Sequence, residues 1–378
     1  MSDFHEKFAR IETEFPQSPH AQTMQRLKMQ LKNRPLFLYG AGGLCDEAIN
    51  VCRAESIHVA GICDGNKAGT YKHSGLAIIS PAQLVSNYAD AIVMITSWRY
   101  EKEIADDLMK KGFPQTQIYP FRPYSISVRK FKEDYFEGYL WMYDHLEDGA
   151  SQKLVLDKVR SYLLDEPLTP NTPHKMYFGE NIFPISEDEV FLDAGAFTGD
   201  TTKDFVEHTQ GKYNHIWLFE PDVLKYEQVV RNLSQYLRTD VVPKGLWSHA
   251  AELPLYGIGE SDSTFIPESE RTIGFTFVSP NAKKQIVPVT SLDAFFDGKP
   301  DHLLPTFIKM DIEGAEKEAL LGALNLIKRV RPKFAIAVEH KPQDIYDLPQ
   351  LLHSVYQDYH FVLRQYHYSF TETILYAY

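Results

Sequence analysis

Residues 190–201 read VFLDAGAFTGDT and decide the fold of the second half of the chain. The first letters form an apolar run typical of a buried strand, and the glycine-containing turn after them leads into a helix. At Gly195 the missing side chain lets a ligand approach the backbone. Gly199 precedes the helix, whose first amide groups point toward that ligand. The pattern therefore predicts a nucleotide-containing ligand at the carboxyl end of this strand.

A second acidic strand end supports the same prediction. The next strand is the apolar run IWLF at residues 216–219, and Glu220 and Pro221 follow it directly. A carboxylate at this position accepts hydrogen bonds from both hydroxyl groups of a ribose. Such an acid suits NAD and S-adenosylmethionine equally, so it does not choose between the two cofactors.

The first turn indicates which of these two cofactors the site suits. A dinucleotide needs glycines arranged so that its pyrophosphate lies on the helix, whereas Asp193 stands at the end of the strand. A carboxylate there repels phosphate and attracts an ammonium group. S-adenosylmethionine supplies such a group, and the turn therefore favours it. The alternative is that Asp193 and Asp200 only cap the following helix.

Three segments resemble the FkbM family of S-adenosylmethionine-dependent methyltransferases. They are FLDAGAFTGDT at residues 191–201, FEP at 219–221 and IKMDIEGAE at 308–316, and VPVTSLD at 287–293 fits as well. The resemblance covers about residues 180–378. It implies a class I methyltransferase fold and an enzyme of the EC 2.1.1 class that methylates a hydroxyl group of a sugar, a glycan or a related metabolite. The residues that we expect to bind the cofactor are Asp193, Gly195, Phe197, Thr198, Gly199, Asp200, Thr201, Glu220 and Pro221.

The candidate catalytic residues lie in the central strands or directly after them. In the sequence FIKMD, side chains alternate between faces, so Lys309 and Asp311 share one. A lysine inside a strand that is covered on both faces is out of place unless it is paired. Asp311 is therefore the first candidate for acceptor binding or proton removal, with Lys309 as its electrostatic partner. The alternative is that Asp311 caps the helix expected over 313–329 and that Lys309 bridges to Glu339 or Asp193.

The next strand ends in Glu339 and His340. A histidine titrates near neutral pH, which suits a general base, although histidines at strand ends also serve as ordinary hydrogen-bond donors. Glu339 and Asp311 could instead hold a divalent metal ion that orients two sugar hydroxyls. The metal is the less favoured alternative.

The whole chain predicts an α/β fold with two doubly wound domains, because apolar runs alternate with helical patterns in both halves. We expect N-terminal helices over residues 1–33, a small Rossmann-like domain over 34–125 and a helical linker over 126–180. The methyltransferase domain would cover 181–378, with a β-rich insertion between Glu252 and Leu292.

The first half carries a second glycine turn, YGAGGLC at residues 39–45. It begins like the dinucleotide-binding pattern GxGxxG, but Cys45 replaces the third glycine, and Asp64 follows where a ribose-binding acid would fall. The segment is similar to small Rossmann-like domains of sugar-modifying enzymes. It leaves three alternatives open: NAD binding, binding of a nucleotide-sugar or another ligand, and a packing or recognition role. The rival function is thus an NAD(P)-dependent oxidoreductase or a nucleotide-sugar-binding protein.

Composition limits the partners. The chain of 378 residues has 39 Lys and Arg against 51 Asp and Glu, a net charge of −12, which disfavours nucleic acid. The expected partner is a small-molecule or glycan acceptor, and the oligomeric state is left open. There is neither an apolar window of about 18 residues nor a signal-peptide pattern at the start. Cys45, Cys52 and Cys63 contain no CxxC pair and are expected to be buried thiols of a cytoplasmic protein.

Overall fold

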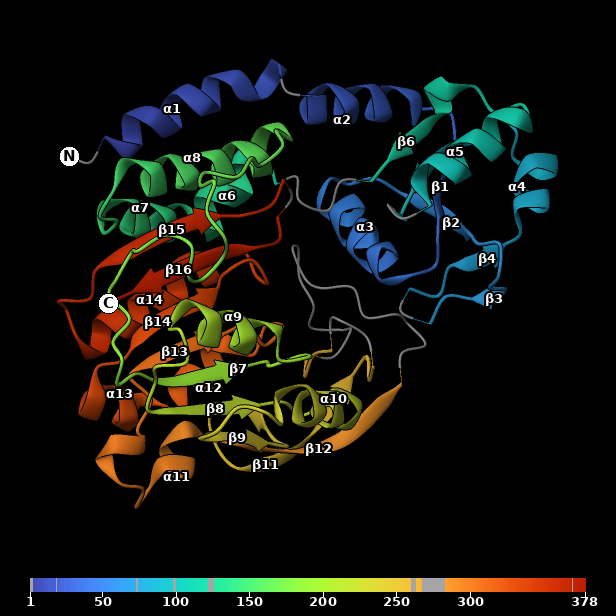
Figure 1. Cartoon of the computed structure of the whole chain (residues 1–378). Coiled ribbons are helices and arrows are strands. Elements are labelled where there is room, and N and C mark those ends of the chain that lie inside the picture. The colour runs from blue at the N-terminus through green and yellow to red at the C-terminus, as the bar shows by residue number, and fades with distance from the viewer. Residues whose placement is uncertain are drawn as a thin grey trace. The chain divides into compact units, whose positions relative to one another are not determined.

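The computed structural model describes residues 3–17, 19–72, 74–97, 100–121, 126–259, 263–266, 283–368 and 370–378 (Figure 1). Contacts divide the chain into two compact units. The C-terminal unit consists of Met1–Ala9, Arg129–Val159 and Glu166–Tyr378, and the N-terminal unit consists of Arg10–Val128 and Arg160–Asp165. Helices α1 (Phe4–Glu14) and α8 (Gly149–Leu164) therefore each contribute residues to both units.

The N-terminal unit is built on a six-stranded sheet in the order β3-β4-β2-β1-β5-β6. Its strands are parallel except for β3, which is antiparallel to β4. The alternation of strands and helices that the sequence predicts is confirmed. Its elements are η1 (Phe15–Gln17), α2 (Pro19–Gln30), β1 (Leu36–Tyr39), α3 (Gly43–Ala54), β2 (Val59–Cys63), β3 (Gly69–Thr70), β4 (Ala77–Ile79), α4 (Pro81–Asn87), β5 (Ile92–Ile95), α5 (Glu101–Lys110), η2 (Gln115–Gln117) and β6 (Ile118–Pro120). The three cysteines are buried and free, as expected.

The C-terminal unit is built on a seven-stranded sheet in the order β15-β16-β14-β13-β7-β8-β9. Its strands are parallel except for β16, which is antiparallel to both neighbours. Its elements are α6 (Val128–Asp134), α7 (Phe136–Asp144), β7 (Val190–Ala194), α9 (Asp200–His208), β8 (His215–Phe219), α10 (Val223–Leu233), β9 (Thr239–Val242), β10 (Gly245–Leu246), β11 (Ala251–Tyr256), β12 (Lys284–Thr290), α11 (Leu292–Phe296), η4 (Asp301–Leu303), β13 (Phe307–Met310), α12 (Glu316–Leu321), α13 (Leu324–Val330), β14 (Lys333–Ala337), α14 (Asp344–Val355), β15 (Phe361–Gln365) and β16 (Thr373–Ala377).

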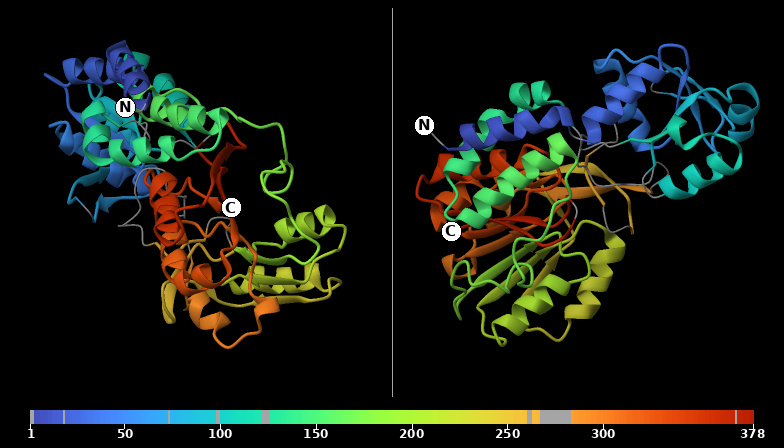
Figure 2. Two further views of the ribbon diagram at one scale, coloured as in Figure 1. Left: turned by 90° about the vertical axis from the view of Figure 1, so that its left-hand side faces the viewer. Right: turned by 90° about the horizontal axis from the view of Figure 1, so that it is seen from above.

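Helices cover both faces of the seven-stranded sheet. Figures 1 and 2 show α9 and α10 on one face and α12, α13 and α14 on the other. Aromatic side chains fill the α9 face: Phe191 stacks on Phe205 with 4.4 Å between the ring centroids, and Phe307 lies 5.2 Å from Phe191. Because the central strands are buried on both faces, their sequences are continuous apolar runs rather than alternations.

The order of the strands creates the site. From β7 the chain runs outward through β8 to β9, and it returns to add β13 and β14 on the other side of β7. In a parallel sheet, the connections diverge at such a reversal and leave a crevice at the carboxyl ends of the strands. Gly195, Glu220 and Asp311 follow β7, β8 and β13, so all three lie at this edge.

Two expectations about the elements are refined. The β-rich insertion is confirmed as a three-stranded sheet, β10-β12-β11, and residues 260–262 and 267–282 of this region lie outside the described residues. The single helix expected over 313–329 is wrong: Gly322 caps the end of α12, and α13 then begins at Leu324.

Among the described residues, no helix combines the length and the apolar character that crossing a membrane requires.

The turn after β7 gives a test of this architecture. Gly195 has a φ of +80°, and a Cβ atom there would lie 1.9 Å from the carbonyl oxygen of Asp311. Gly211 has a similar φ of +75°, but a Cβ atom there meets nothing within 4 Å. We expect Gly211→Ala to lower the free energy of unfolding by about 1–2 kcal/mol through left-handed strain alone. Gly195→Ala should cost about 1–3 kcal/mol more, because the strand ends must move apart. Thermal and denaturant unfolding of the two variants measures the difference, and equal costs would contradict this close approach.

Candidate active site

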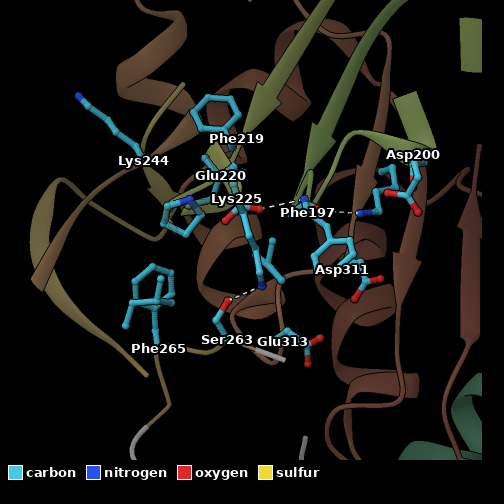
Figure 3. Close-up of a pocket in the computed structure, with 18 of the residues that line it drawn as sticks. Phe197, Asp200, Phe219, Glu220, Lys225, Lys244, Ser263, Phe265, Asp311 and Glu313 are labelled. Atoms are coloured by element: carbon cyan, nitrogen blue, oxygen red, sulfur yellow. Dashed lines mark hydrogen bonds between the residues drawn. The ribbon is translucent and has the colours of Figure 1, made fainter. Parts of the chain in front are cut away.

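A cavity of about 370 Å³ lies at the carboxyl ends of β7, β8 and β13 (Figure 3). The turn after β7, the end of β8, the segment after β13 and the small three-stranded sheet all contribute to its lining. The predicted site residues that line it are Gly195, Phe197, Asp200, Thr201, Glu220, Pro221, Lys309 and Asp311. The predicted residues outside the lining are Asp193, Thr198, Gly199, Glu339 and His340.

The glycine turn leaves the start of α9 open to the cavity. Gly199 is the N-cap residue of α9, has a φ of +82°, and as a glycine offers no side-chain cap to the first amides of that helix. Neither Asp193 nor Asp200 is therefore the N-cap residue of α9. Asp200 and Thr201 form its first turn and line the cavity.

Glu220 connects the end of β8 with the glycine turn. Its side chain is 4% exposed, Oε2 accepts a hydrogen bond from the amide of Phe197 at 2.9 Å, and Oε1 accepts one from the amide of Asp222 at 2.9 Å. Each oxygen keeps a second lone pair, so the carboxylate has capacity for two further donors. Burial raises the pKa of Glu220 to about 7, against the lowering effect of these amides and of Lys225.

Lys309 and Asp193 form a buried ion pair beneath the turn. Lys309 Nζ lies 3.2 Å from Asp193 Oδ1 and donates a hydrogen bond to the carbonyl oxygen of Gly195 at 2.9 Å. The other oxygen of Asp193 accepts a hydrogen bond from Thr202 at 2.9 Å. Burial alone would lower the pKa of Lys309, but the carboxylates of Asp193 and Asp311 outweigh it and raise that pKa. Of the alternatives for Lys309, the bridge to Asp193 is confirmed.

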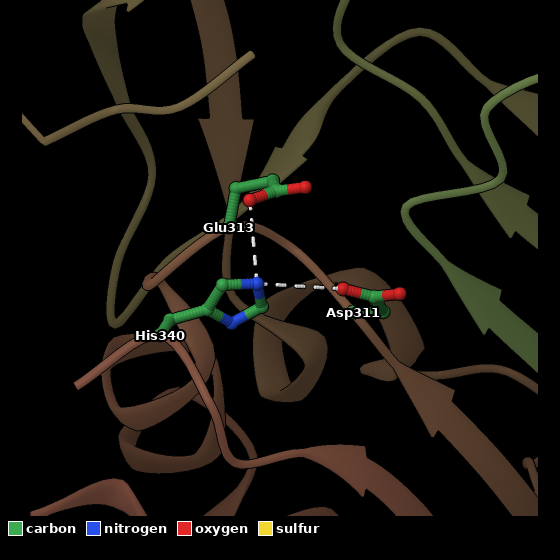
Figure 4. Close-up of side chains that lie close together, drawn as sticks. All are labelled: Asp311, Glu313 and His340. Atoms are coloured by element: carbon green, nitrogen blue, oxygen red, sulfur yellow. Dashed lines mark ion pairs between the residues drawn. The ribbon is translucent and has the colours of Figure 1, made fainter. Parts of the chain in front are cut away.

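Asp311 belongs to a cluster that includes His340 (Figure 4). His340 Nε2 lies 3.2 Å from Glu313 Oε2 and 3.7 Å from Asp311 Oδ1, and its Nδ1 lies 3.1 Å from Glu316 Oε1. Burial acts to lower the pKa of His340, but the carboxylates of Glu316 and Glu313 raise it well above its usual value. Asp311 does not cap α12, whose N-cap residue is Ala315, so that alternative is wrong.

Glu339 is engaged elsewhere. Its two oxygens accept hydrogen bonds from the amides of Glu372 at 2.8 Å and Thr373 at 3.1 Å, where β16 begins. Burial raises the pKa of Glu339 to about 7. The carboxylate that stands beside Asp311 and His340 is that of Glu313, which the sequence analysis did not select. Glu313 could have been selected from the sequence because it lies only two residues after Asp311.

Lys225 is a second cavity residue that the sequence analysis missed. It lies in α10, is 5% exposed, and its Nζ donates to Ser263 Oγ at 3.0 Å and stands 5.0 Å from the centroid of the Phe197 ring. Figure 3 shows it between Glu220 and Ser263. The sequence gives no signal for this lysine, since a charged residue on a helix is ordinarily solvated.

The glycine turn of the N-terminal unit has a similar internal contact. Asp64 Oδ2 accepts a hydrogen bond from the amide of Ala41 at 2.8 Å, as Glu220 does from Phe197, and its Oδ1 accepts from the amides of Asn66 and Lys67. Lys67 Nζ also donates to the carbonyl oxygen of Ala41. Asp64 thus organises its own loop, and a ligand of this turn stays a prediction.

The comparisons with known proteins agree with this architecture. A family model described as the methyltransferase FkbM domain matches residues 193–370. The chain is similar to the crystal structure of methyltransferase FkbM from Methylobacillus flagellatus KT, with 20% identity, a TM-score of 0.62, and coverage of 100% of this chain and 99% of that chain. At this identity the likeness supports the fold alone.

Two other solved structures are less similar. Fibrillarin from Aeropyrum pernix, in complex with S-adenosyl-L-methionine, has 8% identity, a TM-score of 0.30, and coverage of 52% of this chain and 70% of that chain. Precorrin-6y C5,15-methyltransferase from Geobacter metallireducens GS-15 has 12% identity, a TM-score of 0.28, and coverage of 51% and 81%. No curated protein matches the chain. Residues 193–370 thus match the methyltransferase FkbM domain family, and this match supports an S-adenosylmethionine-dependent methyltransferase.

Proposed function

We propose that the chain transfers a methyl group from S-adenosylmethionine to a hydroxyl group of a sugar, a glycan or a related metabolite. The observation that carries the proposal is that Glu220 and Asp311, the acids that end β8 and β13, line one cavity together with the glycine turn. Glu220 suits the ribose of the cofactor, and Asp311 suits a hydroxyl-bearing acceptor. The family match supports the methyl transfer.

The cofactor lies, in this proposal, along the turn after β7. Its ribose hydroxyls donate to the two free lone pairs of Glu220, while Pro221 and Phe197 line the same space. Its ammonium group faces Asp200, which lines the cavity. Thr201 stands beside Asp200 in the first turn of α9, and Thr198 and Gly199 shape the turn behind them.

Asp193 acts on the cofactor through another residue. Because it is fully buried and paired with Lys309, it does not reach the cavity itself. It holds the ammonium group of Lys309, and Lys309 in turn holds the carbonyl oxygen of Gly195. Asp193 is thus a positioning residue that keeps the turn in the shape the cofactor requires.

Methyl transfer is an in-line displacement. The bond between the methyl carbon and sulfur breaks, its electron pair stays on sulfur, and a bond forms between that carbon and the acceptor oxygen. The cofactor leaves as the neutral thioether S-adenosylhomocysteine. The proton of the acceptor hydroxyl passes to the carboxylate of Asp311, which is partly exposed in the cavity.

The ribose assignment predicts a pH dependence of binding. The ribose hydroxyls need the ionised carboxylate of Glu220, and burial raises the pKa of that group to about 7. A proton competes with the ligand below that pH, so affinity for S-adenosylhomocysteine should be about twofold lower at about pH 7 and about tenfold lower at about pH 6 than at about pH 8. Calorimetric titration of the purified chain across this range measures it.

A substitution tests whether Glu220, rather than another titrating group, causes this pH dependence of binding. Glu220→Gln should bind S-adenosylhomocysteine at least about tenfold more weakly at about pH 8, with the pH dependence between about pH 6 and about pH 8 removed. Glu227→Gln, an exposed acid on the same helix as Lys225, is the control and should behave like the unaltered chain. Unchanged affinity in Glu220→Gln would refute the ribose assignment.

Asp311 should matter for turnover more than for cofactor binding. Asp311→Asn keeps the size of the side chain but loses its charge, so methyl transfer should fall about a hundredfold or more while S-adenosylhomocysteine still binds. Single-turnover transfer of labelled methyl to a panel of sugar and glycan acceptors measures this rate. Asp297→Asn, an exposed acid after α11, is the matched control. A fully active Asp311→Asn variant would exclude the proposed proton transfer.

A further inference from the structure

Asp311, Glu313 and His340 meet at the edge of the cavity with the residue types of a metal site (Figure 4). One carboxylate oxygen from each acid and one imidazole nitrogen lie within 4.8 Å of one another. We propose that these three residues, the carboxylate–histidine cluster, bind a divalent first-row metal ion, and that the ion holds two neighbouring hydroxyl groups of the acceptor. The role toward the acceptor rests on the proposed function, whereas the binding of the ion does not.

The spacing of the ligand atoms fits a shared ion. His340 Nε2 lies 3.2 Å from the oxygen of Glu313 and 3.7 Å from that of Asp311. Adjacent ligands about 2.0–2.3 Å from one metal ion stand about 3.0–3.6 Å apart, so small side-chain movements would complete the geometry. The two strands that supply the cluster, β13 and β14, are parallel neighbours, and their carboxyl ends therefore present these residues at one edge.

A buried carboxylate stands behind the histidine. Its side chain is nine-tenths or more buried, and Nδ1 faces the carboxylate of Glu316, which is 1% exposed and also accepts a hydrogen bond from the amide of Ile312 at 2.9 Å. A buried carboxylate on the second nitrogen fixes the ring orientation in many metal sites. Nε2, on the other side of the ring, is directed between Glu313 and Asp311, as Figure 4 shows.

Carboxyl groups outnumber the basic groups His340 and Lys341 around the cluster. Besides the carboxylates of Asp311 and Glu313, one oxygen each of Glu316 and Asp344 is buried without a hydrogen-bond partner among the described residues. Buried carboxylate oxygens are costly unless they are paired with a cation or a donor. A divalent ion at the cluster supplies two positive charges at this place.

The remaining coordination positions face the acceptor. Asp311 and Glu313 line the cavity, whereas His340 lies behind them, so a bound ion is open on the cavity side. Two adjacent hydroxyls of a sugar can bind such an ion together, and the ion would favour loss of the proton from the one that is methylated. One imidazole with two carboxylates suits Mn²⁺ or a similar ion better than Ca²⁺.

Direct metal binding tests the inference without any need for an acceptor. The full chain is treated with a chelator, exchanged into buffer and titrated with Mn²⁺ alone, with electron paramagnetic resonance reporting the free ion. We expect one bound Mn²⁺ per chain, with affinity at least about tenfold lower in His340→Asn and in Glu313→Gln. Glu318→Gln, an acid of α12 outside the cluster, is the control and should bind as the unaltered chain does.

Parallel titration of each sample with S-adenosylhomocysteine shows that it is folded and tests the proposed function separately. Retained S-adenosylhomocysteine binding without stoichiometric Mn²⁺ binding to the unaltered chain would overturn the metal site alone. Mn²⁺ binding without S-adenosylhomocysteine binding would overturn the proposed function alone. Equal Mn²⁺ affinity in the unaltered chain and in both cluster variants would mark an adventitious ion only and overturn the inference.

Discussion

The cavity edge of the C-terminal unit depends on the buried ion pair between Lys309 and Asp193. It joins neighbouring strands at the point where the strand order reverses, and the lysine also binds the carbonyl oxygen of Gly195. Separating two such charges in a buried site is strongly unfavourable, so the pair fixes how closely β7 and β13 approach. Gly195 then passes against the backbone of Asp311, where a side chain has no room. The cavity follows from these constraints rather than from any one ligand-binding residue.

The sequence predicted the central strands because a strand covered on both faces must be an uninterrupted apolar run. It did not predict β16, whose residues TILYA are mostly apolar and all buried. This strand is antiparallel and follows β15 after a short connection, so the alternation of strand and helix that revealed the other strands is absent there. Because β16 was not predicted, the hydrogen bonds that Glu339 accepts at its start were not predicted either. Glu339 looked available because the amides of Glu372 and Thr373 that occupy it belong to the start of that strand.

The acids at the strand ends were more predictable than their roles. Parallel strands bring their carboxyl ends to one edge, so Glu220 and Asp311 could be placed near each other from the sequence alone. Contacts between individual side chains could be identified only in the folded chain. Nothing in the local sequence shows that Lys309 pairs with Asp193 or that Glu313 lies beside His340. Lys225 was missed for the same reason, since its contact with Ser263 joins α10 to a residue 38 positions away.

The central claim is that one cavity, formed after β7, β8 and β13, holds the cofactor with its ribose on Glu220 and its sulfur toward Asp311. A crystal structure of the chain with S-adenosylhomocysteine tests it most directly. The account predicts both ribose hydroxyls within hydrogen-bond distance of the Glu220 carboxylate and the thioether sulfur on the side of the cavity that Asp311 lines. Ligand density at the glycine turn of the N-terminal unit instead, or a ribose that does not contact Glu220, would contradict it.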